Sequence, residues 1–236
     1  MIWIFVALLV GWGNAGSSLL GGTARLPGGS VAYAMTGVTL VVLSLVIARR
    51  AGLDLATIGL RSSAWLRGAA IGIVGGAAFA LTAILSLQLA SAIVGGHVLY
   101  DPLRDVTEAE LLRHVLFFLP FGAVLPEEIA FRGTLVGLLR ARGTRATLVG
   151  SAAAFALWHA AVAIFTVGET TVAAPSPWFL PAIIGALAVV FAGGVVLAWL
   201  RLWTDTLATT IAAHWVFNAT LLVGLWATLP VPTPHA

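Results

Sequence analysis

Cysteine and lysine are both absent from the 236-residue chain, and only 9% of its residues are charged. Without cysteine there can be no disulfide, no thiol nucleophile and no Cys-ligated zinc or iron–sulfur site. Soluble domains have roughly 25% charged residues. With 60% hydrophobic residues and a mean hydropathy of +1.05, this chain is predicted to be a polytopic membrane protein. The formal charge of +3 comes from 12 arginines against 9 acids, and we expect no nucleic-acid partner.

Long apolar runs recur along the chain, each near the ~20 residues that a helix needs to cross the hydrocarbon core. We therefore expect an all-α fold, with a single integral membrane domain over residues 1–236 and a bundle of about seven to eight transmembrane helices. The higher number applies if the long fourth run splits near Pro126. Pro120 and Pro126 are expected to kink that run, because proline removes a helix donor. The runs are residues 2–20, 31–48, 68–94, 111–139, 147–167, 180–200 and 207–229.

Most arginines gather in alternate loops between these runs, whereas the loops over residues 95–110 and 167–179 are mainly acidic. Loops rich in arginine stay on the cytoplasmic side of a membrane. The pattern predicts a multi-pass protein of the cell membrane with a cytoplasmic N-terminus. The loops assigned to the cytoplasmic side hold Arg49, Arg50, Arg61 and Arg67, then Arg140, Arg142 and Arg145, and finally Arg201.

Three charged residues, Glu127, Glu128 and Arg132, interrupt the fourth apolar run. Each costs roughly 2.5–3.5 kcal/mol at the centre of a bilayer, so the cluster must face other protein groups and is expected to be functional. Glu128 and Arg132 are spaced i, i+4 and can pair on one helix face, which leaves Glu127 as a surplus, desolvated carboxylate. The alternative is a purely structural ion network.

Two later runs supply imidazoles at a similar expected depth. His159 follows Phe155 by four residues, and His214 precedes Asn218 by four, so each pair shares a helix face. At 1.5 Å per residue, each candidate lies roughly 20 Å from an arginine near the cytoplasmic end. If the last helix begins at Asp205, His214 lies nearer to the cytoplasm. The spacings are thirteen residues from Glu127 to Arg140, fourteen from Arg145 to His159 and thirteen from Arg201 to His214.

Two kinds of chemistry suit these residues, and the sequence leaves both open. A water between Glu127 and His159 can be deprotonated to attack a peptide carbonyl, while His214 and Asn218 donate to the oxyanion. Alternatively, Glu127 or Glu128 with His159 and His214 can bind a divalent metal such as zinc around an activated water. Phe155 is expected to pack beneath His159.

With these motifs the chain resembles the CAAX protease and bacteriocin-processing family, also called the Abi or type II CAAX prenyl endopeptidase family. The family pattern of two glutamates, three residues and arginine matches Glu127, Glu128 and Arg132. Its phenylalanine–histidine and histidine–asparagine motifs match Phe155 with His159 and His214 with Asn218. The motifs fall in a protease-like core over residues 111–229.

The resemblance implies an α-helical intramembrane endopeptidase, often labelled a metalloprotease, in which the first glutamate and the second-motif histidine activate water. The last histidine and asparagine would then line the oxyanion site. Expected partners are membrane lipid and a protein or peptide substrate, with or without a lipid group. Two other functions compete. A proton-coupled small transporter also uses buried carboxylates and histidines, and an immunity or binding protein would hold its ligand without cutting it.

Overall fold

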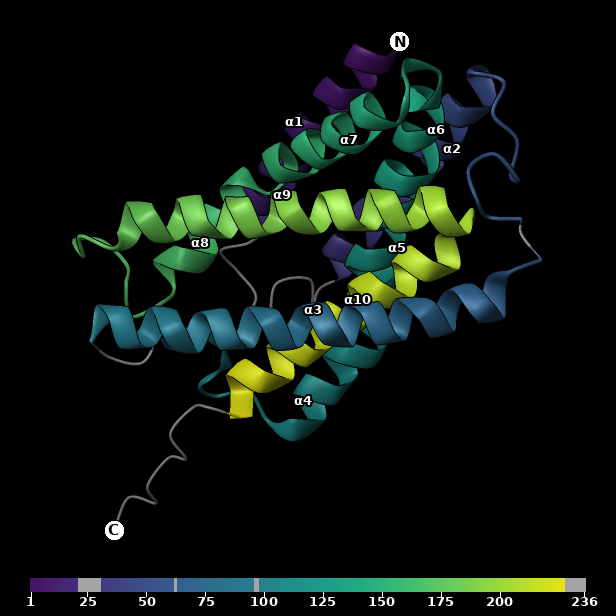
Figure 1. Ribbon diagram of the computed structural model, residues 1–236. Helices are drawn as coiled ribbons and strands as arrows, with labels where there is room; N and C mark the ends of the chain where they lie inside the picture. The colour runs from purple at the N-terminus through teal and green to yellow at the C-terminus, as the bar shows by residue number, and fades with distance from the viewer. Residues whose placement is uncertain (21–30, 62, 96–97, 228–236) are drawn as a thin grey trace.

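A computed structural model describes residues 1–20, 31–61, 63–95 and 98–227, and this part consists of helices, turns and one isolated β-bridge between Tyr100 and Thr170 (Figure 1). The expected all-α class is confirmed. In chain order the elements are α1 (Ile2–Leu20), α2 (Val31–Arg50), α3 (Trp65–Val94), η1 (Asp101–Leu103), α4 (Glu108–Arg113), η2 (His114–Val124), α5 (Leu125–Glu128), η3 (Ile129–Leu135), α6 (Val136–Leu139), η4 (Arg140–Arg142), α7 (Thr144–Trp158), α8 (Ala160–Gly168), α9 (Phe179–Thr204) and α10 (Leu207–Ala227).

Five helical segments in the described part of the chain are long and apolar enough to cross a membrane. A sixth is added if α7 and α8, which meet at a bend of 46°, form one broken span. The second apolar run forms α2, a helix of 20 residues. The chain is an integral multi-pass membrane protein, and the expected count of about seven spans stays a prediction.

The long fourth run forms one continuous helix from Glu108 to Arg142, so the split near Pro126 that would have given an eighth helix does not occur. Its segments η2 and η3 are π-helical, with turns wider than those of an α-helix. Pro120 lies within η2 and Pro126 at the start of α5, and because a proline nitrogen cannot donate, the i, i+4 hydrogen bond is missing at both positions. The amide of Leu125, for example, donates to the carbonyl of Pro120, five residues earlier. The two π segments flank the acidic pair.

Helices α3 and α10 pack closely, with α10 passing behind α3 in Figure 1. A glycine stripe on α3 makes this approach possible. A Cβ at Gly72 would lie 2.2 Å from the carbonyl oxygen of Thr209, and one at Gly76 would lie 2.4 Å from that of Ala213. Any side chain at these glycines would push α10 away. The stripe therefore sets the position of the helix that carries His214.

An ionic cluster of Arg140, Arg201 and Asp205 holds the turn between α9 and α10. The fully buried guanidinium of Arg201 donates to the carbonyl of Thr57 at 2.8 Å and to the carboxylate of Asp205 at 2.9 Å. Arg140 donates to the same carboxylate at 2.7 Å. Partial burial favours a higher pKa for Asp205, but the hydrogen bonds from Arg140 and Arg201 outweigh it and hold that pKa below its ordinary value.

This turn corrects one part of the depth prediction. Arg201 belongs to α9, and α10 begins only at Leu207, so His214 lies seven residues into its own helix rather than thirteen. The turn is covered by the α2–α3 loop, where the carbonyl of Gly59 accepts from the amide of Leu207 at 3.0 Å. Gly59 has φ +80°, and a Cβ there would lie 2.6 Å from the Arg201 guanidinium. Because α10 begins at Leu207, its first residue lies closer to the site than Arg201 does.

Candidate active site

Glu128 and Arg132 form the predicted i, i+4 pair. One guanidinium nitrogen of Arg132 donates to Oε1 of Glu128 at 3.0 Å, and both side chains are completely buried. A buried charge is tolerated only with a partner, so each residue stabilises the ionised form of the other. Glu128 is therefore a carboxylate, and its neighbour Glu127 is left to face a different direction.

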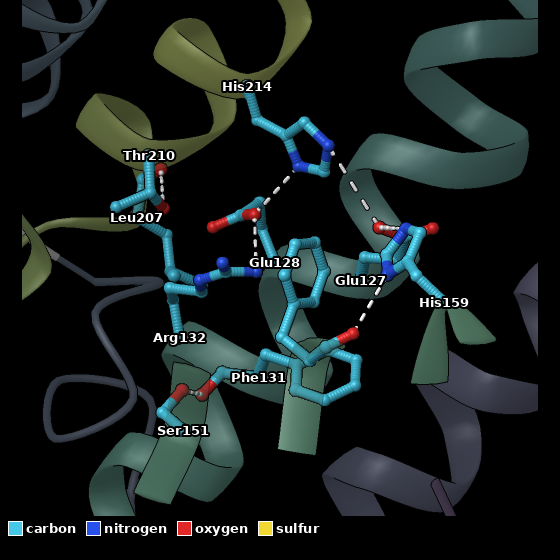
Figure 2. Close-up of polar contacts among 10 residues, drawn as sticks. Glu127, Glu128, Phe131, Arg132, Ser151, His159, Leu207, Thr210 and His214 are labelled. Atoms are coloured by element: carbon cyan, nitrogen blue, oxygen red, sulfur yellow. Dashed lines mark hydrogen bonds and ion pairs between the residues drawn. The ribbon is translucent and has the colours of Figure 1, made fainter. Parts of the chain in front are cut away.

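Glu127 faces the two imidazoles that the sequence singled out (Figure 2). Its Oε2 lies 3.8 Å from Nε2 of His159 and 4.0 Å from Nε2 of His214. The three side chains come from α5, from the junction of α7 and α8, and from α10, and Glu127 retains 9% of its side-chain exposure. Groups separated by up to 87 residues in the sequence thus meet within one small polar site.

The orientation of His159 is set by its own helix. Its Nδ1 lies 2.9 Å from the carbonyl oxygen of Phe155, and because a carbonyl can only accept, Nδ1 must carry the hydrogen. In the neutral ring, Nε2 is then an acceptor, and this is the nitrogen that faces Glu127. A water that donates one hydrogen to Glu127 and one to His159 matches this arrangement.

His214 is held in a similar way. Its Nδ1 lies 2.8 Å from Oε1 of Glu128, the carboxylate oxygen that also accepts from Arg132. An ionised carboxylate only accepts, so Nδ1 is again the donor. A relay thus runs from Arg132 through Glu128 to His214, and it points Nε2 of His214 at Glu127.

Phe155 packs beneath both imidazoles, and it also contacts the buried cation. Its ring centroid lies 4.4 Å from that of His159 and 5.9 Å from that of His214. The guanidinium carbon of Arg132 lies 4.0 Å from the same centroid, at cation–π distance. The sequence predicted the packing under His159. It gave no signal for the contact with Arg132, because that contact depends on how η3 and α7 pack.

Asn218 lies on α10 one helical turn after His214 and is half-buried. Within the described residues its side chain makes no hydrogen bond, so its amide is available to a ligand. Sequence reasoning missed how α10 is fixed near this point: the indole nitrogen of Trp215 donates to the carbonyl of Val115 in η2 at 2.9 Å. A tryptophan next to a motif histidine was the available signal.

The metal-binding alternative gains no support from this geometry. Among the described residues, no group of three or more His, Asp or Glu side chains is arranged to hold a metal ion. Glu127, His159 and His214 converge, but they do not form a ready-made set of ligands.

The chain was compared with family models, curated proteins and solved structures. Residues 110–220 match the model of the type II CAAX prenyl endopeptidase Rce1-like family. No curated protein matches, and no solved structure matches. The matched segment begins in α4, contains all three motifs and ends two residues after Asn218. The segment from residue 110 to residue 220 is a type II CAAX prenyl endopeptidase domain of the Rce1-like family, as the motifs indicated.

Proposed function

We propose that this protein is an intramembrane endopeptidase that hydrolyses a peptide bond with a water activated by Glu127 and His159. The observation that carries the proposal is the meeting of Glu127, His159 and His214 in a buried site, with distances of 3.8 and 4.0 Å from Glu127 Oε2 to the imidazoles. The family match points to the same class of reaction.

Glu127 acts as the general base. The 3.8 Å between Oε2 of Glu127 and Nε2 of His159 is too long for a direct hydrogen bond. A water that bonds both atoms would lie to one side of the line between them, about 2.8 Å from each. Glu127 takes one proton from this water while the oxygen of the water attacks the carbonyl carbon of the peptide bond. Glu127 then gives that proton to the leaving amine as the C–N bond breaks.

His214 and Asn218 stabilise the oxyanion. The buried cluster has two carboxylates and one guanidinium, so a single proton on an imidazole brings its formal charge to zero. We assign this proton to His214, because that ring lies 2.8 Å from Glu128 and 4.0 Å from Glu127. As an imidazolium, His214 donates from Nε2, and the free amide of Asn218 is a second donor. Fixed donors in a water-poor site are effective at this task.

The substrate is proposed to be a membrane-associated or lipidated protein or peptide. The acids lie in a helix that is long and apolar enough to span a membrane, so a soluble polypeptide would not reach them easily. The matched family is named for endopeptidases of prenylated proteins, which supports a lipidated substrate. In this proposal the N-terminus is cytoplasmic, and the loops rich in arginine support that orientation.

A comparison of membrane-protein fragments in cells tests this function and identifies substrates together. One strain would express the wild type, a second Glu127→Gln, and a third Glu108→Gln, which changes an exposed acid on the same continuous helix. We expect some fragments to be present in the wild-type and Glu108→Gln strains and missing from the Glu127→Gln strain. Identical fragment sets in all three strains would reject proteolysis and favour a transporter or a binding protein.

A separate measurement tests the metal alternative. Elemental analysis of the purified protein, followed by activity after chelation, would detect a zinc enzyme. Sub-stoichiometric zinc and full activity after chelation are expected from the glutamate mechanism. Stoichiometric zinc, with activity that chelation abolishes, would replace it.

A further inference from the structure

Asn14 is a polar residue in the mainly apolar helix α1, far outside the segment that matches the family. Its side-chain amide makes three hydrogen bonds of 2.8 Å, and one of them goes to Val10 in its own helix. The other two cross to another part of the protein: Nδ2 donates to the carbonyl of Leu157, and Oδ1 accepts from the amide of Ala161. These partners lie two residues before and two residues after His159.

Leu157 and Ala161 are spaced i, i+4, so in an unbroken α-helix the carbonyl of the first would accept from the amide of the second. Here the helix bends by 46° between α7 and α8, and His159 is the residue at the break. The amide of Asn14 occupies the gap and satisfies both backbone groups. A side chain inserted in this way is a recognised cause of sharp helix kinks.

We propose that Asn14 is a positioning residue that holds the helix open at His159 and so directs the imidazole toward Glu127. The inference rests on the proposed function, because it assigns Asn14 to the same site. Unpaired N–H and C=O groups are costly inside a membrane, so the break persists only with such a partner. Without Asn14, the direct bond between Leu157 and Ala161 can re-form, and straightening the helix would turn His159 away.

The residue before Asn14 supports this role. Gly13 is buried and packs against the ring of Trp158, the residue before His159, and a Cβ at Gly13 would lie 2.4 Å from that ring. Any larger residue would displace either α1 or the indole. Gly13 therefore lets α1 approach the break closely enough for the short side chain of Asn14 to reach it.

The first test compares three variants with the wild type, using a peptide whose cleavage depends on Glu127. Asn14→Leu removes both polar contacts, and we expect kcat to fall about 10- to 100-fold with KM nearly unchanged, since a small misplacement of a catalytic group has effects of this size. Asn14→Gln keeps the amide group on a side chain that is one methylene longer, and it should retain more activity than Asn14→Leu. Ser17→Ala is the control, because among the described residues the Ser17 hydroxyl bonds within α1 alone, to the carbonyl of Gly13.

The second test needs no proteolysis. Protein labelled with ¹⁵N-histidine is observed by NMR in detergent, and the His159 signals are assigned from their loss in His159→Gln. The wild type and Ser17→Ala should show the tautomer with hydrogen on Nδ1, whereas Asn14→Leu should show altered His159 signals. If the enzyme cleaves nothing, the proposed function fails while this measurement still decides the role of Asn14. Wild-type His159 signals together with wild-type kcat in Asn14→Leu would overturn the inference.

Discussion

Replacing Arg132 by methionine removes the cation that neutralises Glu128 but keeps a side chain of similar length. In the wild type the pair is separated by 3.0 Å and neither side chain is exposed. The substitution also removes the cation over the ring of Phe155. Glu128 would then be a buried carboxylate that keeps its hydrogen bond from His214 but has no cation to pair with from Arg132. The substitution therefore tests the ionic pair and the aromatic contact together.

The expected loss is large. Breaking a buried ion pair by removing one partner costs about 3–5 kcal/mol. For a protein of this size, each kcal/mol lowers Tm by roughly 2–4 °C, so Arg132→Met should lower Tm by about 6–20 °C. The exposed pair of Arg104 and Asp101, at 2.9 Å, provides the matched control. Exposed pairs contribute about 0.2–1 kcal/mol, so Arg104→Met should lower Tm by only a few degrees.

Thermal unfolding in detergent, followed by fluorescence of the nine tryptophans, measures both variants. The double variant Arg132→Met/Glu128→Gln leaves no unpaired buried charge and should recover much of the loss. If Arg132→Met melts like the wild type, or if Arg104→Met is destabilised as strongly, the buried pair does not have the role assigned to it.

Three further substitutions test other parts of the structure. Gly76→Ala should lower both Tm and activity, because its Cβ would lie 2.4 Å from the carbonyl oxygen of Ala213. Gly75→Ala is the control and should leave both unchanged, because its Cβ would meet nothing within 4 Å. Equal effects of the two substitutions would refute the packing argument. Asn218→Ala should lower kcat by about 10²–10³-fold without changing Tm, as expected for an oxyanion donor, and a wild-type kcat would remove it from the mechanism. Because the pKa of Asp205 is held below its ordinary 3.8, its ionic contacts stabilise the fold above that pH and are lost as the pH falls below it. The Tm difference between wild type and Asp205→Asn should therefore shrink on acidification, and a constant difference would contradict the role of the carboxylate.

Much of the architecture was predictable because a membrane restricts the choices. An apolar run of about 20 residues in a bilayer has to form a helix, and charged residues within it have to find partners. The i, i+4 spacing of Glu128 and Arg132 predicted a pair that the structure contains. Depth measured from arginines predicted that Glu127 meets the imidazoles, although for His214 the reference arginine belongs to a different helix.

The remaining details depend on contacts between segments that are distant in the sequence. The two prolines predicted a disturbance in the fourth run. Whether the helix breaks or widens there depends on which backbone groups find hydrogen-bond partners in neighbouring segments. Asn14 had no motif around it, and its partners Leu157 and Ala161 lie more than 140 residues away. The contact of Phe155 with Arg132 likewise requires two helices to pack in one particular way.

The most direct test of the mechanism is the cleavage rate of purified Glu127→Gln in proteoliposomes, measured on a peptide identified from the fragment comparison. Glutamine has the size of glutamate but cannot accept the proton of the attacking water. A general base contributes about 10²–10⁴-fold, so the rate should fall by at least 10²-fold while Tm stays close to that of the wild type. Cleavage by Glu127→Gln at nearly the wild-type rate would contradict the assignment of Glu127 as the base.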